Sequence, residues 1–123
     1  MCGIAGYFGT NLPERCRIYA ASNLLSHRGP DGEGIYTKEE KNRNSLALIH
    51  RRLSIIDLDA RSNQPFRVGE KVIVMNGEIY NYIELRNELK SLGYQFHTKG
   101  DTEVLAKALY EWGHMAQDRF EGM

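Results

Sequence analysis

The chain has 123 residues, of which 41% are hydrophobic and 26% are charged. This size and composition are typical of one folded globular domain rather than of a disordered segment. Its 16 basic residues balance 16 acidic ones, so the sequence lacks the positive charge typical of proteins that bind nucleic acids or membrane surfaces. Neither nucleic acid nor membrane is therefore expected as a partner.

Signals for targeting and for metal binding are also missing from the sequence. No apolar run approaches the roughly 20 residues that a membrane span needs, and the N-terminus does not resemble a signal peptide. We therefore expect a cytoplasmic protein. Two cysteines, Cys2 and Cys16, are too few for a disulfide framework, and with four histidines they show no spacing typical of zinc. No metal and no cofactor is expected in this chain.

Patterning in the first half of the chain predicts short strands and one helix. The expected elements are a glycine-rich buried strand over residues 2–8, an amphipathic helix over 13–25 with Pro13 in its first turn, a loop over 27–34, and strands over 34–37 and 45–50. Residues 38–44 are expected to form a polar connection. Cys16 lies on the apolar stripe of the predicted helix, which favours core packing over redox chemistry.

The second half predicts one strand and two helices. A β-branched run indicates a strand over residues 71–75, after a polar connection over 57–69. A helix is expected from Tyr82 to a glycine stop at Gly93, and another opens at Asp101, which suits the N-cap. Strands bracketed by helices, without regular strand-helix alternation, indicate an α+β domain rather than a parallel doubly wound sheet.

Cys2 directly follows the initiator methionine. Removal of Met1 would place a thiol and a free α-amino group on one residue, and such an amino group titrates near about 7.7 to 8.0. It can then exchange a proton with the thiol or a leaving amine near neutral pH without help from a histidine. From the position of Cys2 alone, a small buried residue in a first strand is the better interpretation.

Six motifs along the chain change that weighting. They are MCGIAGYFG at 1–9, HRGPDG at 27–32, HRRLSIIDL at 50–58, NQPF at 63–66, NGEIYNYIELR at 76–86 and GDTEVL at 100–105. Together they resemble the class II glutamine amidotransferase domain, in particular the glutaminase domain of asparagine synthetase. The resemblance implies an N-terminal-nucleophile hydrolase fold, a four-layer αββα sandwich of antiparallel sheets. Residues 1–123 would be the N-terminal portion of such a domain, incomplete at the C-terminus.

The resemblance assigns catalytic roles to three residues. Cys2 matches the nucleophile that attacks the side-chain amide of glutamine to form a glutamyl thioester, which water hydrolyses. Asn76 and Gly77 match the side-chain and backbone donors that stabilise the oxyanion. An amide donor and a glycine that permits close approach suit this task, although the dipeptide alone would indicate an Asn-Gly turn.

Four other residues match positions that bind the substrate. Arg52 matches the residue that holds the α-carboxylate of glutamine, for which a guanidinium fork is suited, whereas Arg51 is expected to face solvent. Asp101 matches the acceptor of the α-ammonium group. Glu78 lies beside that group in the family, and Ile55 supplies a backbone contact.

The remaining motif residues are expected to be structural. Arg28 and Asp31 are available to brace the floor of the pocket, without a catalytic step. Ordinary core or surface roles are expected for the remaining histidines and aromatic residues, namely His27, His50, His97, His114, Tyr80, Tyr82 and Trp112.

The resemblance thus implies an enzyme that hydrolyses glutamine to glutamate and ammonia for asparagine synthesis. Its partner in the family is a synthetase domain, which uses ATP and magnesium to adenylate aspartate. The alternative is a non-catalytic truncated or pseudo-enzyme module that binds glutamine or a partner chain. A chain ending at residue 123 would leave sheet edges open, so weak activity alone is expected, and a homo-oligomer is one way to cover those edges.

Overall fold

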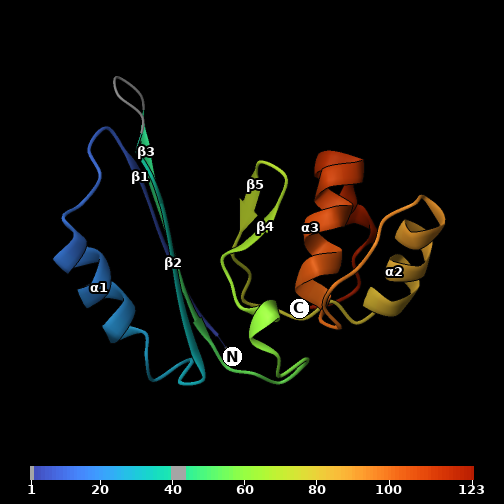
Figure 1. Cartoon of the computed structure of the whole chain (residues 1–123), viewed down its shortest axis with the longest axis horizontal. Helices are drawn as coiled ribbons and strands as arrows, with labels where there is room; N and C mark the ends of the chain where they lie inside the picture. Colours follow the sequence, from blue (N-terminus) through green and yellow to red (C-terminus); the bar gives the residue numbers. More distant parts are fainter. Residues whose placement is uncertain (1, 40–43) are drawn as a thin grey trace. The chain divides into compact units, whose positions relative to one another are not determined.

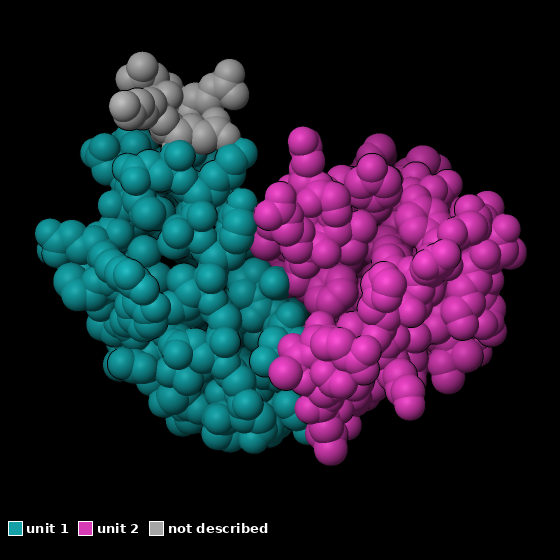
Figure 2. All heavy atoms as spheres, in the orientation of Figure 1, with its two compact units in different colours: residues 1–54, 63–65, 74–76 teal, residues 55–62, 66–73, 77–123 magenta. Residues whose placement is uncertain are grey.

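The computed structural model describes residues 2–39 and 44–123. The chain forms two compact units: unit 1 comprises residues 1–54, 63–65 and 74–76, and unit 2 comprises residues 55–62, 66–73 and 77–123 (Figure 2). The paired strands are antiparallel, which confirms the α+β class with antiparallel sheets. Met1 and most of the polar connection expected over 38–44 lie outside the described residues.

Unit 1 is built on a three-stranded antiparallel sheet in the order β1 (Gly3–Gly9), β3 (Ser45–Arg52), β2 (Gly32–Lys38) (Figure 1). The central strand β3 pairs Arg51 with Gly3 of β1, and Arg52 with Gly32 of β2. Because this register is antiparallel, the start of β1 lies beside the end of β3. The residue before β1, Cys2, is thereby brought next to the residues that follow Arg52.

Helix α1 (Arg15–Leu24) lies along one face of this sheet (Figure 1). Its buried Ile18 packs with Ala47 and Ile49 of β3. The predicted apolar stripe was wrong, because Cys16 is exposed while Ser22 is buried. The Ser22 hydroxyl donates to Glu33 at 2.5 Å, so a polar contact helps to orient the helix. The helix begins at Arg15, which leaves Pro13 outside its first turn.

Arg51 is not the solvated arginine that the sequence suggested. Its Nε donates to the carbonyl and to the hydroxyl of Ser22, both at 3.1 Å, and its Nη2 donates to Asn23 Oδ1 at 2.9 Å. Glu33 lies directly opposite on β2, with its Oε1 3.4 Å from Arg51 Nη2. The Arg51 side chain is only 14% exposed. Arg51 therefore fastens α1 to the sheet.

Unit 2 contains a hairpin of β4 (Phe66–Val68) and β5 (Lys71–Ile73), the helices α2 (Tyr82–Ser91) and α3 (Asp101–Trp112), and the 3₁₀ segments η1 (Ala60–Ser62) and η2 (Gly113–Arg119). Helix α3 lies between the hairpin and α2 (Figure 1). Apolar side chains of the two helices form its core, namely Leu85, Leu89, Val104, Ala106 and Ala108. In the described parts of the chain, no helix combines the length and apolarity that a membrane crossing requires.

Several element boundaries in unit 2 differ from the prediction. Strand β4 lies inside the polar connection expected over residues 57–69. It was not predicted, because a strand of three residues is too short to show a recognisable alternation of apolar and polar residues. Strand β5 ends at Ile73, short of residue 75. Tyr80, expected in the core, is exposed. The predicted stop of α2 is confirmed, with Gly93 at φ 95 just after the helix.

Asp101 is the first residue of α3 and not its cap. The N-cap is Gly100, and no side chain makes the capping hydrogen bond. The Asp101 carboxylate instead accepts the backbone N–H of Ile79 at 3.0 Å, a partner far away in sequence. A tertiary contact has thus replaced the local one that the sequence suggested.

Glu103 and Lys107 form a buried ion pair within α3, and the Glu103 carboxylate also binds the segment before the helix. Glu103, 1% exposed, lies 2.5 Å from Lys107 Nζ and accepts hydrogen bonds from Thr98 N and Thr98 Oγ1 at 2.7 Å, and from His97 N at 3.0 Å. Burial opposes the charged carboxylate, but these donors outweigh it, so the pKa of Glu103 is lowered from 4.5.

We expect Glu103→Gln to lower the free energy of unfolding by about 3 kcal/mol, because it leaves the buried Lys107 ammonium unpaired. Urea unfolding measures this loss. The matched control is Glu88→Gln, which breaks the exposed pair of Glu88 with Arg119 and should cost less than about 1 kcal/mol. Equal losses in the two variants would contradict the role of Glu103.

The lowered pKa of Glu103 predicts that the free energy of unfolding depends on pH. With the folded pKa of Glu103 below its unfolded value, the unfolded state binds more protons in acid. The stabilisation by Glu103 is therefore present above pH 4.5 and is lost as the pH falls through the folded pKa. The difference in unfolding free energy between wild type and Glu103→Gln should shrink over that range.

Candidate active site

Cys2 lies at the end of the unit 1 sheet where β1 begins. Its Sγ accepts the backbone N–H of Leu53 at 3.4 Å and is 3.7 Å from the Leu53 carbonyl oxygen. The residue is half-buried, and neither Cys2 nor Cys16 is in a disulfide. A reachable sulfur beside a fixed N–H donor has the access and the electrostatic support that a nucleophilic thiolate needs.

The loop over residues 27–32 forms hydrogen bonds with the backbone of Cys2 and with the backbone on either side of Leu53. Arg28 Nε donates to the Cys2 carbonyl at 3.1 Å. Asp31 donates its backbone N–H to the Arg52 carbonyl at 2.9 Å and accepts the N–H of Ser54 through its carboxylate at 2.8 Å. The bracing role expected for Arg28 and Asp31 is thus visible within unit 1.

Arg52 is buried at the end of β3. It is 6% exposed, and its Nη1 donates to Asn63 Oδ1 at 2.7 Å. The Asn63 amide oxygen is an acceptor, so this bond orients the guanidinium. The sequence analysis gave Asn63 no role, although it opens the NQPF motif.

Asn76 follows a residue whose backbone is held on both sides. The N–H of Met75 donates to Gln64 Oε1 at 2.5 Å, and the Met75 carbonyl accepts from His50 Nε2 at 3.3 Å. Gln64 and His50 are both buried. These two side chains fix the backbone next to Asn76, a role that the sequence analysis missed because Gln64 lies 11 residues away along the chain.

The surroundings of His50 favour its neutral form in the folded chain. Because Nε2 donates to the Met75 carbonyl, the unprotonated nitrogen is Nδ1, which is buried with no hydrogen-bond partner among residues 2–39 and 44–123. Burial lowers the pKa of His50 and the nearby Arg52 charge adds to this effect, against the opposing bond to Met75. His50 thus orders the site and is poorly suited to proton transfer.

The other predicted residues lie in unit 2. Asp101 is buried, and its bond to the Ile79 N–H places it beside the backbone that follows Glu78. Glu78 is half-buried and exchanges two backbone hydrogen bonds of 3.0 Å with Met123. Ile55 is 63% exposed.

Packing requires a glycine at position 77. A Cβ on this residue would collide with the carbonyl oxygen of Met123. The absence of a side chain therefore lets another backbone lie against the residue that was predicted to offer its N–H.

The predicted residues thus fall into two groups. Unit 1 holds Cys2, Arg52 and Asn76, whereas unit 2 holds Ile55, Gly77, Glu78 and Asp101. Three of the passages of the chain between the units fall inside motifs, at Ser54–Ile55, at Pro65–Phe66 and at Asn76–Gly77.

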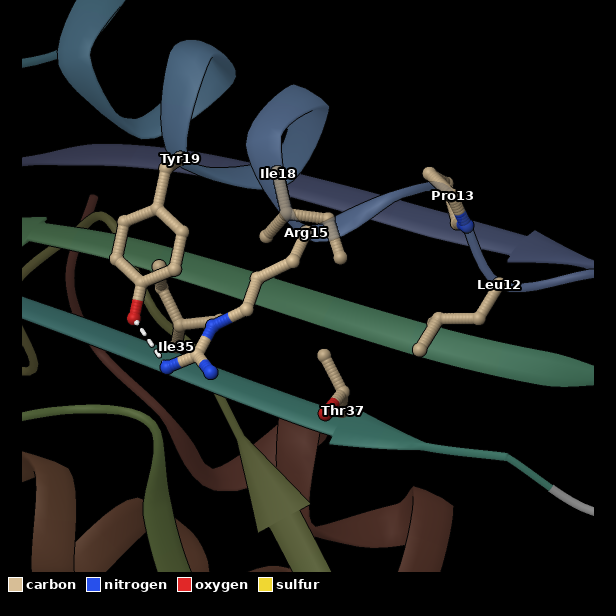
Figure 3. Close-up of a pocket in the computed structure, with 7 residues that line it drawn as sticks. All are labelled: Leu12, Pro13, Arg15, Ile18, Tyr19, Ile35 and Thr37. Carbon is tan, nitrogen blue, oxygen red and sulfur yellow. Dashed lines mark hydrogen bonds between the residues drawn. The ribbon is translucent and has the colours of Figure 1, made fainter.

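Unit 1 also has a cavity of about 310 Å³ bordered by α1 and β2 (Figure 3). Arg15 Nη2 donates to the Tyr19 hydroxyl at 3.3 Å across its rim. Its lining contains neither cysteine nor any of the predicted site residues. Among the described residues, no group of three or more histidine, cysteine or acidic side chains is arranged to hold a metal ion.

Comparison with known families places this chain in a class. The sequence profile of a family described as a glutamine amidotransferase domain matches residues 1–123. The chain therefore belongs to the glutamine amidotransferase domain family.

Its relatives are asparagine synthetases. The glutamine-hydrolysing asparagine synthetase 1 of Bacillus subtilis (strain 168) is 37% identical over 130 residues, covering 100% of this chain and 20% of that protein. The enzyme of Zea mays is 39% identical over 128 residues, with the same coverage. A putative asparagine synthetase of Mycobacterium tuberculosis is 38% identical over 138 residues, covering 100% of this chain and 21% of that protein. The chain thus spans about a fifth of the length of these relatives.

The neutral state of His50 predicts how stability responds to pH. Since its folded pKa is lowered from 6.5, the unfolded state binds more protons below that pH. The stabilisation is present above pH 6.5 and is lost as the pH falls through the folded pKa. We expect the unfolding free energies of wild type and His50→Gln to converge over this range in urea titrations. The exposed His114→Gln serves as control, and convergence of the same size there would contradict the assignment.

Proposed function

We propose that this chain is the glutaminase part of an asparagine synthetase and forms a thioester between Cys2 and glutamine. The observation that carries the proposal is the Cys2 sulfur held by the Leu53 N–H, beside the buried Arg52, in a chain of the amidotransferase family. Residues 1–123 form the N-terminal portion of the domain. The finer architecture is the four-layer N-terminal-nucleophile hydrolase sandwich of antiparallel sheets.

The reaction begins when the α-amino group of Cys2, freed by removal of Met1, accepts the thiol proton. The sulfur attacks the amide carbon of glutamine, and the Asn76 side chain and the Gly77 N–H stabilise the oxyanion. The amino group then gives its proton to the leaving nitrogen, which departs as ammonia and leaves a thioester. Water hydrolyses this thioester to glutamate and restores the thiol.

Charged groups at both ends bind the amino-acid part of glutamine. Arg52 pairs with the α-carboxylate, for which its burial and its bond to Asn63 make it a fixed partner. Asp101 accepts the α-ammonium group, with Glu78 beside it and a backbone contact from Ile55. The ammonia passes to a synthetase domain, and this step is supported by the greater length of the relatives.

Covalent labelling tests the nucleophile. A glutamine-mimicking electrophile should label Cys2 and spare Cys16, since only Cys2 lies beside the substrate groups. A small general thiol reagent should instead favour Cys16, because Cys16 is exposed and Cys2 is half-buried. Peptide mapping by mass spectrometry, with excess glutamine as competitor, separates the two patterns. Equal labelling by the glutamine mimic would refute the assignment.

Steady-state kinetics of the full-length protein tests the binding and oxyanion roles. Arg52→Ala should weaken glutamine binding by about 1.5 to 3 kcal/mol, the loss of a hydrogen bond to a charged group, and raise KM. Asn76→Ala should lower kcat by about 10² to 10³, because its donor matters most when the oxyanion forms. The reverse division between KM and kcat would exclude these roles.

A further inference from the structure

Three charged side chains of unit 2 converge on the backbone of residues 97–100, directly before Asp101. Asp57 comes from the segment that precedes η1, Arg86 comes from α2, and Glu103 comes from α3. Their bonds hold the N–H groups of residues 97, 98 and 99 and the carbonyls of residues 98 and 100. Hydrogen bonds to ionised groups are among the strongest that a protein makes. We name these three residues the clamp.

Asp57 is the most unusual member of the clamp. It has φ 54, the only positive value recorded for a non-glycine residue in the described parts of the chain. This conformation costs about 1 to 2 kcal/mol. Its carboxylate accepts from the Lys99 N–H at 2.6 Å, the Ser62 hydroxyl at 2.7 Å and the Asp59 N–H at 3.2 Å. These bonds hold the strained backbone in place.

Arg86 holds the same segment through its carbonyls. Its Nη1 donates to Thr98 O and its Nη2 to Gly100 O, both at 2.7 Å. The guanidinium also lies over the Phe96 ring, 4.9 Å from the centroid. The fork thus spans the last turn of chain before the helix.

Glu103 contributes a local order to the start of α3, since it lies in the first turn of the helix and accepts the N–H groups of His97 and Thr98. Asp57 is different because it lies 42 residues from its partner Lys99 and is held at a conformational cost. A local capping requirement does not explain that contact. Its effect is to fix Lys99 and Gly100, and with them the neighbouring Asp101.

We propose that Asp57 is a positioning residue that aligns Asp101 with the α-ammonium group of glutamine. This inference rests on the proposed function, in which Asp101 accepts that group. The ammonium is bound in the ground state and in the transition state alike, so loss of alignment raises KM with little change in kcat. A shift of Asp101 by a fraction of an ångström is enough, because charge-assisted hydrogen bonds depend steeply on distance and angle.

Asp57→Gly tests the proposal, since glycine adopts φ 54 without strain and removes only the acceptor. In the full-length protein it should raise KM for glutamine about tenfold, with kcat within about twofold. Asp57→Asn keeps an acceptor oxygen and tolerates positive φ, so its KM should stay within about threefold of wild type. Asp59→Ala, which removes the neighbouring exposed carboxylate, is the control and should leave both constants unchanged.

A substrate without the α-ammonium group separates positioning from general damage. For glutaramate, the analogue of glutamine that lacks this group, Asp57→Gly should leave kcat/KM unchanged, whereas a purely structural defect would lower it for both substrates. Hydrogen exchange of the Lys99 amide provides a readout independent of catalysis and should be faster in Asp57→Gly. If that variant does not fold, Ser62→Ala loosens Asp57 without touching its backbone and should raise KM in the same direction.

The outcomes are distinguishable. An active wild type with an unaltered KM for glutamine in Asp57→Gly, or equal losses for glutamine and glutaramate, overturns the positioning role alone. Unchanged exchange at Lys99 overturns the clamp itself. A wild type that neither hydrolyses glutamine nor labels at Cys2 overturns the proposed function, and the role of Asp57 in glutamine binding falls with it.

Discussion

The register of β1 against β3 is the constraint on which unit 1 depends. With Gly3 opposite Arg51, the chain start meets the end of β3, and the Cys2 sulfur reaches the Leu53 N–H. A slip by one residue would move every side chain of β1 to the other face of the sheet. The packing of Ala5 of β1 against the cluster of Ile18, Ala47 and Ile49 opposes such a slip, because Ala5 must stay on the helix side.

Charged side chains hold separate segments of this chain together, a task that apolar packing often performs in other proteins. Arg51 ties α1 to the sheet, Glu103 ties α3 to the preceding segment, and Asp57 ties that segment to the loop before η1. Of the three, only Glu103 is fully buried, and each charge has several hydrogen-bond partners. Such networks have few alternative arrangements, so they specify geometry more narrowly than a small apolar core can.

Periodic patterns in the sequence predicted the elements that are long enough to carry them. The three helices and β1 and β3 were found for that reason, whereas the three-residue β4 was missed. The errors on Arg51 and Asp101 have one origin. In both cases a partner distant in sequence decided the orientation of the side chain: Ser22 for Arg51, and the Ile79 N–H for the Asp101 carboxylate.

The candidate site residues came from motif resemblance, and of their supports only Arg28 and Asp31 were given that role from the sequence. Met75 is held by His50 and Gln64, Leu53 by Cys2, and the residues before Asp101 by the clamp.

In each place the fold holds the backbone beside a proposed functional side chain. The physical reason is that a side chain that is to meet a substrate must keep some of its polar atoms for that substrate. Order at such a residue has to come through its neighbours. The backbone N–H and C=O groups of these neighbouring residues are not paired within a helix or a sheet. Polar side chains from distant parts of the chain form their hydrogen bonds instead. Gln64 and Asp57 lie inside two of the motifs, but their roles emerge only from contacts with Met75 and Lys99, which are distant from them in sequence.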